Sequence, residues 1–341
     1  MVTMKDIGIA AGVSRQTVSQ VLNGQRAGGV HISPVTRERV MEKARHLGYH
    51  RNELARAVKR GRTDVIAYIG GGYTSFEMRT IAGINAGLKE CGFTLKMFLL
   101  NAGNSLDDAI RQCREQMVAG VICMSQHLDN LEQLHRSLTL SGIPVMQVDE
   151  GVQCDWCGLV RSDDVAGGRM AVEHLLGLGH RRIGLLAAEC DNRYAVMRSQ
   201  GYHAAMTAAG ITPDPALKVT VPVITGWEEQ QKRILSGYLL EQRPTAVFCV
   251  ADPLAVKLLL AANMLGIKVP DDLSVVGYAD LDFASFSIPP LTTVAQPFEE
   301  EGRNAAASLV NIINGPGPHT PVNLELPVKM IIRDSTALLK K

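Results

Sequence analysis

Fifteen residues near the start of the chain, AAGVSRQTVSQVLNG (Ala10–Gly24), decide how its N-terminal part folds. Gly12 falls between two helical stretches, and glycine tolerates the positive φ that a sharp turn requires. Ser14 follows the turn, where its hydroxyl can accept a hydrogen bond from a backbone N–H at the start of a second helix. An apolar stripe then runs along Val13, Val18, Val21 and Leu22. The stretch therefore predicts two short helices joined by a tight turn, with polar side chains on the outer face of the second.

The flanking residues extend this pattern to three helices. Thr3 can cap a first helix over residues 4–10, and Ser33 with Pro34 predicts the start of a third, because Pro fits the first helical turn. The core face of that third helix carries Val40, Ala44 and Leu47. The segment NELARAVKRGRT, residues 52–63, predicts a short basic helix that acts as a linker.

Charge is distributed unevenly along the chain. Residues 1–62 hold 12 Lys and Arg against 4 Asp and Glu, a net charge of +8, while the remainder holds 23 against 30, a net charge of −7. A dense basic charge on one small segment is typical of a module that contacts nucleic-acid phosphates. The apolar periodicity of the same segment argues against the alternative, a solvated basic tail.

The composition predicts a globular protein of two or three domains. The chain has 341 residues, 46% of them hydrophobic, which is enough for substantial cores. The sequence contains no run of about 18 apolar residues, so no membrane-spanning helix is expected. Lys5 and Asp6 interrupt the first residues, which lack the apolar centre of a secretion signal. A cytoplasmic location is therefore expected.

From Asp64 onward, apolar strand-like runs alternate with helical stretches. The runs include VIAYIG, GVICMS, IPVMQVD, RIGLLAA, TAVFCVAD and LSVVGYAD. This alternation predicts parallel α/β sheets that bind ligands at the carboxyl ends of their strands. There are too many units for one small sheet, and the pattern restarts after Asp163, so two similar lobes are expected.

No catalytic, metal or cofactor site emerges from the sequence. Cys154 and Cys157 have the spacing of a redox dithiol or of half a zinc site, but no second close Cys/His pair accompanies them. Unpaired structural or surface thiols are the favoured interpretation. His174 and His180 are not spaced for a metal, and the glycines of GGGYTSF lack the Lys-Ser/Thr of a phosphate-binding loop.

The chain resembles the LacI/GalR family of bacterial transcription regulators along essentially its whole length. The residues that carry the resemblance are TMKDIGIAAGVSRQTVSQVLNG, TRERVMEKARHLGY, NELARAV, EHLLGLGHRRIGLL, VPDDLSVVGYAD, PPLTTVAQP and LPVKMIIRDST. Each motif alone is weak evidence, but seven of them occur in the family's order.

The resemblance implies a helix-turn-helix headpiece and a two-lobed α/β effector domain similar to periplasmic binding proteins. The headpiece is expected over residues 1–50, a hinge helix or linker over 51–63, and the effector and dimerisation domain over 64–341. The N-lobe is expected at about 64–161 and 292–324. The C-lobe is expected at about 162–291 and 325–341.

In this family the helix after the turn enters the major groove of DNA. The matching base-contacting positions are Arg15, Gln16 and Gln20, since Arg pairs with guanine and Gln with adenine edges. Ser14, Thr17 and Asn23 are interpreted as phosphate contacts, which set the register without reading the sequence. The alternative is that these are solvated polar residues of an ordinary helix.

The hinge segment both matches and departs from the family. Asn52, Ala55 and Arg56 match the family's hinge pattern, whereas Val58 stands where a Leu usually wedges into the minor groove. Val is shorter and β-branched, so it would unstack a base step less deeply. The loop over residues 25–32 is also longer than usual. Both departures bear on the bend of the operator and the spacing of its half-sites.

The resemblance also implies an effector site between the lobes. Its predicted members are Tyr73, Thr74, Phe76, Asp163, Arg198, Trp227, Asp252 and Asp280. Ala251 and Ala279 replace an Asn and an Asp with which many family members bind ligand hydroxyls. A sugar acid, phosphorylated sugar or nucleobase-like effector is therefore favoured over a neutral hexose, unless other residues supply the missing contacts or no effector binds.

The combined prediction is a DNA-binding transcriptional repressor that acts as a homodimer on a pseudo-palindromic operator. A small effector between the lobes would control its affinity. The alternative is a small-molecule binding protein of the periplasmic type without DNA regulation. Such a protein would need to be exported and would have no basic headpiece. An enzyme would need a catalytic constellation that the sequence does not offer, and no cofactor is expected.

Overall fold

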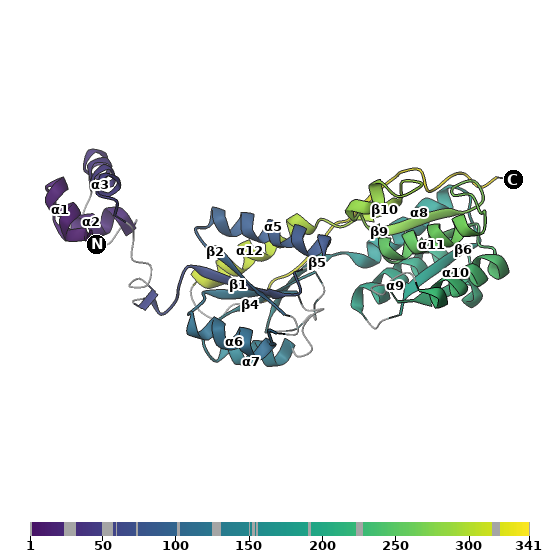
Figure 1. The fold of residues 1–341 in the computed structure, drawn as a ribbon, viewed down its shortest axis with the longest axis horizontal. Coiled ribbons are helices and arrows are strands. Elements are labelled where there is room, and N and C mark those ends of the chain that lie inside the picture. The colour runs from purple at the N-terminus through teal and green to yellow at the C-terminus, as the bar shows by residue number, and fades with distance from the viewer. Residues whose placement is uncertain are drawn as a thin grey trace. The chain divides into compact units, whose positions relative to one another are not determined.

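The computed structural model divides the chain into two compact units, Met1–Thr63 and Asp64–Lys341. The division falls where the sequence predicts the end of the linker. The structure describes residues 2–23, 32–49, 57–58, 60–72, 74–100, 103–124, 131–149, 151, 154, 156–189, 192–222, 228–315 and 321–340. Each unit is described by itself, and Figure 1 traces the elements of both.

The first unit contains the three predicted helices, α1 (Met4–Ala11), α2 (Arg15–Asn23) and α3 (Pro34–His46). Thr3 caps α1 as predicted, in a reciprocal capping box with Asp6. Gly12 makes the turn to α2 with a φ of 64°. The Ser14 hydroxyl then accepts a hydrogen bond of 3.1 Å from the Thr17 N–H, which starts α2.

These helices close around a small apolar core. Its buried members are Ile7, Ala11, Val18, Val21, Leu22, Val40 and Ala44. Val13 and Leu47 pack against it while remaining partly exposed, as the predicted stripes require. The helix-turn-helix prediction is therefore confirmed, and Arg15 and Gln16 at the start of α2 are exposed.

The described residues of the second unit form two six-stranded sheets. The first has the strand order β11 (Asn323–Leu326), β5 (Gly158–Ser162), β4 (Val145–Val148), β3 (Gly120–Cys123), β1 (Val65–Gly70) and β2 (Thr94–Leu99). The second has the order β12 (Lys329–Ile331), β10 (Thr292–Ala295), β9 (Ser274–Ala279), β8 (Ala246–Cys249), β6 (Ile183–Ala188) and β7 (Lys218–Val221). Neighbouring strands are parallel except β10 and β12, so the predicted two-lobed α/β fold is confirmed.

Helices connect most of these strands. They are α5 (Ser75–Glu90), α6 (Leu106–Glu115), α7 (Leu131–Thr139), α8 (Asp164–Gly177), α9 (Arg193–Ala208), α10 (Glu229–Gln242), α11 (Asp252–Met264) and α12 (Phe298–Asn314). Among the described residues, short 3-10 turns lie at Pro215–Leu217 and Asp282–Ser285. Within the described residues, no helix is both long and apolar enough to span a membrane.

Sheet membership differs from the expected lobe limits where the chain crosses between lobes. Residues 292–295 were expected in the N-lobe, but they form β10, which pairs with β9 and β12 of the C-lobe sheet. Residues 325–326 were expected in the C-lobe, but they belong to β11, which pairs with β5 of the N-lobe sheet. Strand pairing decides these limits, and local sequence pattern does not reveal it.

Both faces of the N-lobe sheet are covered, because alternate residues of a strand point to opposite sides. Ile66 and Tyr68 belong to one core with residues of α5 and α12, whereas Ala67 and Ile69 belong to another with residues of α6 and α7. Figure 1 shows these two helix pairs on opposite sides of the sheet. The apolar run VIAYIG is therefore a strand that is buried on both faces.

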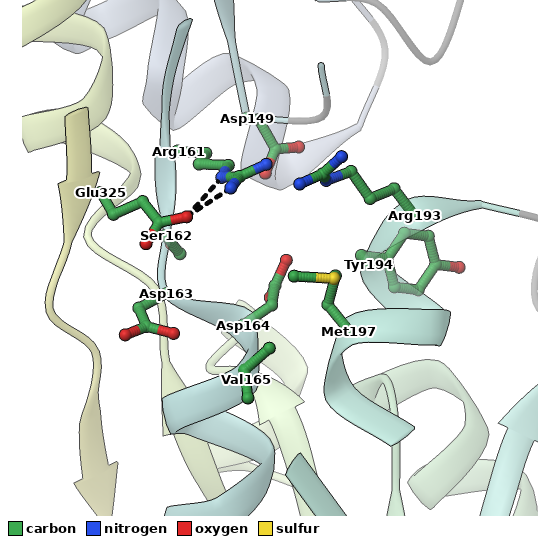
Figure 2. A pocket seen from close by; sticks show the side chains of 10 residues that line it. All are labelled: Asp149, Arg161, Ser162, Asp163, Asp164, Val165, Arg193, Tyr194, Met197 and Glu325. Atoms are coloured by element: carbon green, nitrogen blue, oxygen red, sulfur yellow. Dashed lines mark hydrogen bonds and ion pairs between the residues drawn. The ribbon is translucent and has the colours of Figure 1, made fainter. Parts of the chain in front are cut away.

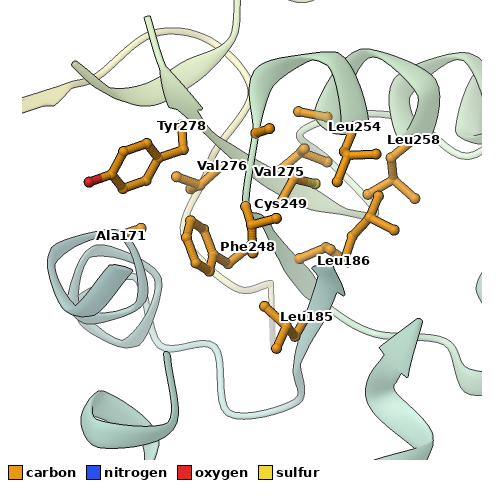
Figure 3. Packing of buried hydrophobic residues seen from close by; sticks show 14 of the residues in the cluster. Ala171, Leu185, Leu186, Phe248, Cys249, Leu254, Leu258, Val275, Val276 and Tyr278 are labelled. Carbon is orange, nitrogen blue, oxygen red and sulfur yellow. The ribbon is translucent and has the colours of Figure 1, made fainter. Parts of the chain in front are cut away.

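The C-lobe sheet is covered in the same way. Figure 3 shows Phe248 on the side of Ala171 in α8, and Cys249 toward Leu254 in α11. The Phe248 ring also packs against the Tyr278 ring, with centroids 6.5 Å apart. Asp252 lies three residues beyond the end of β8, and Asp280 directly follows β9.

Two helix pairs of the second unit cross at glycines. A Cβ on Gly83 of α5 would overlap the carbonyl of Glu299 in α12, and a Cβ on Gly168 of α8 would overlap the carbonyl of Arg198 in α9. Because glycine has no Cβ, these positions let the two backbones touch. The crossing of α8 and α9 places Arg198 beside the start of α8.

We expect Gly168→Ala to lower the free energy of unfolding by about 1–3 kcal/mol, because an added methyl group forces two packed backbones apart. Gly177→Ala is the matched control on the same helix, since a Cβ there meets no atom within 4 Å. The control should leave stability unchanged or raise it slightly, because Ala favours a helix over Gly. Urea unfolding followed by circular dichroism measures both, and a fully stable Gly168→Ala variant would contradict the crossing.

Candidate functional site

A pocket of about 170 Å³ lies in the second unit, where β4 and β5 end and α8 and α9 begin (Figure 2). Polar and charged side chains dominate its lining, which comprises Asp149, Arg161, Ser162, Asp163, Asp164, Val165, Arg193, Tyr194, Met197 and Glu325. The position agrees with the rule that parallel α/β sheets bind ligands at the carboxyl ends of their strands. Asp163 is the one predicted effector residue in this lining.

Arg198 lies next to the pocket and is almost completely buried, with 4% of its surface exposed. Its Nε donates to the Asp164 carboxylate at 2.7 Å, and its Nη1 donates to the Val250 carbonyl at 2.8 Å. The Tyr278 ring lies under the guanidinium, 3.8 Å from its centre. Burial by itself would lower the pKa of Arg198, but Asp164 outweighs it and the pKa is raised. Arg198 therefore remains a cation that the protein itself neutralises.

A hydrogen-bonded chain leads from Arg198 to a second buried ionisable group. Its Nη2 donates to the Gln296 side-chain oxygen at 2.9 Å, and the Gln296 amide donates to the Ser162 hydroxyl at 3.3 Å. Ser162 in turn donates to the carboxyl group of Glu301 on α12. Burial, reinforced by the negative charge of Asp149, raises the pKa of Glu301 well above its usual range. Burial thus disfavours the charged form of Glu301 at the end of this hydrogen-bonded chain.

The two acidic residues at the start of α8 have different tasks. Asp163 caps the helix, since its Oδ1 accepts a hydrogen bond of 2.9 Å from the Ala166 N–H. Asp164 is the ion-pair partner of Arg198. Both line the pocket, so a ligand there would meet them while their main partners remain within the protein. Contact between Asp163 and an effector stays a prediction.

Asp252, another predicted effector residue, lies inside the C-lobe. Its side chain is fully buried, and its two oxygens accept hydrogen bonds from the Thr293 hydroxyl at 2.6 Å and the Leu281 N–H at 2.8 Å. Burial raises the pKa of Asp252 to about 6, although these two hydrogen bonds act in the opposite direction. The structure thus gives Asp252 a scaffolding position between α11 and β10.

Asp280 follows β9 and also has an internal partner. Its carboxylate accepts a hydrogen bond of 2.7 Å from Arg333, and its carbonyl accepts one of 3.2 Å from Arg79 of α5. The backbone at Ala279 and Asp280 adopts positive φ values of 115° and 53°. A residue other than glycine is strained at positive φ and persists there only when surrounding contacts stabilise it. At Asp280 the hydrogen bonds from Arg333 and Arg79 provide this stabilisation.

The remaining predicted effector residues are Tyr73, Thr74, Phe76 and Trp227. Thr74 caps α5 by accepting from the Glu77 N–H. The Phe76 ring packs against the Phe298 ring, with centroids 5.8 Å apart, and touches the cores of both lobes. Tyr73 and Trp227 lie outside the described residues. Neither Thr74 nor Phe76 is in the pocket lining.

The sequence did not single out several pocket residues. Tyr194 and Arg193 lie about one helical turn before Arg198 on α9, so the spacing of a helix could have placed them near the same site. Arg161 and Asp149 stand at the ends of β5 and β4, where the rule for strand ends would have found them. Glu325 is in β11, and only its pairing with β5 brings it here.

The predicted DNA-contacting face of α2 is accessible. Arg15, Gln16 and Ser14 are exposed, while Gln20 and Thr17 are half-buried. The Ser14 and Thr17 hydroxyls lie 2.9 Å apart, so they bond to each other at the start of the helix. Asn23 ends α2. Each of these contacts with DNA stays a prediction.

The linker is described in part. Val58 is in a helical segment with 75% of its surface exposed, so it is available to a partner. Asn52, Ala55 and Arg56 lie outside the described residues, as does most of the loop over residues 25–32. The predicted wedge at Val58 is therefore compatible with its exposure and stays a prediction.

Cys154 and Cys157 differ in burial and in their contacts. Cys157 is buried, and burial raises its pKa to about 12, whereas Cys154 is half-buried and donates to the Cys157 carbonyl at 3.7 Å. Across the described ranges, no group of three Cys, His, Asp or Glu side chains is arranged to hold a metal ion.

Comparisons with known proteins agree with this architecture. A family model described as bacterial regulatory proteins of the lacI family matches residues 3–52, and one of a periplasmic binding protein-like domain matches residues 172–336. The HTH-type transcriptional regulator CelR of Thermobifida fusca is 33% identical over 347 residues, 98% of either chain. This chain belongs to the LacI family of bacterial regulatory proteins. The HTH-type transcriptional repressor PurR of Vibrio atlanticus is 32% identical over 321 residues, 92% of either chain.

Solved structures of LacI-family proteins share the fold. A complex of the regulator CelR with cellobiose has a TM-score of 0.71 at 31% identity and covers 98% of this chain and 100% of that one. The lac repressor dimer bound to operator and the anti-inducer ONPF has a TM-score of 0.74 at 27% identity, with coverages of 98% and 99%. This LacI-family chain is therefore a DNA-binding transcriptional regulator and not an enzyme.

The raised pKa of Asp252 predicts a pH dependence of stability. The folded protein holds this proton up to about pH 6, whereas the unfolded chain releases it near its ordinary value of 3.8. The free energy of unfolding should therefore fall as the pH rises from about 4 to about 6, by up to roughly 2–3 kcal/mol from this group.

Asp252→Asn removes that titration while keeping the size of the side chain. We expect the variant to lose less stability than the wild type between pH 4 and pH 7, as measured by urea unfolding at each pH. The Glu301 contribution is common to both proteins and cancels in the difference. An identical pH dependence would contradict the buried position of Asp252.

Proposed function

We propose that this protein is a transcriptional repressor that binds a pseudo-palindromic operator as a homodimer, and that a small effector in the pocket between α8, α9 and the ends of β4 and β5 controls its affinity. The observation that carries the proposal is the exposed polar face of α2 on a basic helix-turn-helix unit, joined to a second unit with a polar pocket. PurR and the lac repressor are both named as repressors. Their names support repression of transcription, and not activation, as the proposed effect of this protein.

In the proposed complex α2 lies in the major groove. Arg15 and Gln16 at its start contact base edges together with Gln20, because Arg and Gln pair bidentately with guanine and adenine. Ser14, Thr17 and Asn23 contact phosphates and fix the register. Two copies of the headpiece on a dimer would meet two half-sites related by a two-fold axis.

The linker would meet the minor groove at the operator centre. There the exposed Val58 takes the place of the wedge, with Asn52, Ala55 and Arg56 beside it. A branched side chain that is shorter than Leu inserts less deeply between base pairs, so the proposed operator bends less than one wedged by Leu. This lesser bend is part of the proposal.

The effector is proposed to be a sugar acid, a phosphorylated sugar or a nucleobase-like compound. Neutral hexoses need several paired hydroxyl contacts, and two positions that many family members use for them are Ala251 and Ala279 in this chain. Arg198 and the carboxylates at Asp252 and Asp280 have internal partners. The groups left to face a ligand are those that line the pocket.

Arg15→Ala is expected to weaken specific operator binding by roughly 1–3 kcal/mol and random-DNA binding less, because it removes a base contact. Fluorescence anisotropy measures both on an operator selected from a random library by the wild-type protein. Arg233→Ala, which removes the same charge from the exposed surface of α10, is the control and should change neither affinity. Equal losses on the two DNAs would reject a base contact for Arg15.

A thermal-shift screen of the full chain tests the effector class. Sugar acids, sugar phosphates and nucleobases should raise the melting temperature more than neutral hexoses at the same concentration, because a ligand of the folded state stabilises it by mass action. The compounds with the largest shifts are then tested for release or strengthening of operator binding. A larger shift with a neutral hexose would reject the proposed class.

A further inference from the structure

Arg193 is the first residue of α9 and contributes its side chain to the pocket. Figure 2 shows the guanidinium extending from the helix into the space between α9 and the ends of β4 and β5, in the direction of Asp149. The residue is half-buried. A cation in this position is accessible to a small ligand and yet partly withdrawn from water.

The other two arginines of this region have carboxylate partners. Arg161 donates from its Nε to Glu325 at 2.9 Å, and Arg198 donates to Asp164 at 2.7 Å. In the described part of the chain, no hydrogen bond or ion pair engages the side chain of Arg193. The buried Nη1 of Arg161 likewise has no hydrogen-bond partner among the described residues. The pocket therefore holds more N–H donors of guanidinium groups than the protein satisfies.

The electrostatic environment of Arg193 is unfavourable to its charge. Burial lowers the pKa of Arg193, and the positive charge of Arg161 lowers it further. The carboxylates of Glu325 and Asp164 act in the opposite direction but do not outweigh these effects. A negative group placed at the guanidinium would therefore gain a charge-assisted hydrogen bond and relieve the repulsion from Arg161.

The acidic residues of the pocket do not fill this role, because each already serves another group. Asp164 neutralises Arg198, Glu325 neutralises Arg161, and Asp163 caps α8. Asp149 accepts a long hydrogen bond of 3.5 Å from the Gln296 amide. Although carboxylates surround the pocket, none of them forms an ion pair with Arg193 among the described residues.

We propose that Arg193 binds an oxyanion of the effector, a carboxylate or a phosphate monoester carried by a small polyhydroxylated molecule. The planar guanidinium donates two parallel N–H groups, which fit the oxygens of either anion. Arg161 adds positive charge on the other side of the anion. Tyr194 and Met197 line the wall beside Arg193 and would contact the less polar part of the ligand. This inference rests on the proposed effector-controlled repressor and names the residue that selects the effector.

Titration calorimetry on the full-length protein tests the proposal with three probes, gluconate, glucose 6-phosphate and glucose. Wild-type protein should bind gluconate or glucose 6-phosphate more tightly than glucose, and the tighter of the two tells a carboxylate from a phosphate ligand. Arg193→Gln should weaken binding of that anion by roughly 10- to 150-fold, the range for loss of a charged hydrogen bond, and leave glucose binding unchanged. Arg193→Lys should lose less, since it keeps the charge without the planar fork.

Arg233→Ala removes the same charge outside the pocket and should bind all three probes as the wild type does. Melting temperatures of the variants confirm that each is folded. Equal anion binding by Arg193→Gln and wild type would overturn the proposal, as would an equal loss for glucose and the anion, or the failure of both anions to bind wild-type protein. Operator binding, measured on the same preparations, is independent of these outcomes, so the proposed repressor function can stand where this inference fails.

Discussion

The second unit of this protein depends on the neutralisation of one buried cation, the guanidinium of Arg198. A buried charge costs several kcal/mol of desolvation, so it is stable only when its partners are close and its N–H groups are satisfied. Asp164, the Val250 carbonyl and the Gln296 side chain supply those partners. They come from the start of α8, the end of β8 and the end of β10, so one charge fixes the positions of three segments. Glycine at the α8–α9 crossing makes the approach possible.

The polarity of the pocket follows from the same constraint. Because Asp164 neutralises Arg198 and Glu325 neutralises Arg161, these carboxylates are not free to serve the neighbouring cation. Glu301 is buried near them, and burial raises its pKa well above the usual range of a glutamate. Arg193 is then left with its charge exposed to the pocket. A site that contains many acids can in this way present a cation to its ligand.

Local pattern predicted the elements well and their pairing less well. Helix caps at Thr3 and Ser14 and the glycine turn between them follow from short-range chemistry, so the headpiece could be predicted to within one residue at the end of α1. The family motif singled out Arg198 and Asp252. It did not reveal that Asp252 is buried inside the C-lobe, where both its carboxylate oxygens accept hydrogen bonds. Residues from about 292 onward were expected in the N-lobe, whereas residues 292–295 form β10, which pairs with β9 and β12 of the C-lobe sheet. No local pattern in the sequence reveals this pairing.

The sequence by itself determined the class of the protein: a basic helix-turn-helix unit, a two-lobed α/β domain, and a regulator of the LacI family. Periodicity, caps and charge are properties of neighbouring residues, and they are readable without a fold. The tertiary structure alone decided which ionisable groups neutralise one another. Glu325 meets Arg161 only through the pairing of β11 with β5, and Arg193 is left without an ion pair in the described residues because the nearby acids have other partners. Contacts between distant segments set these charges, so composition and spacing could not predict them.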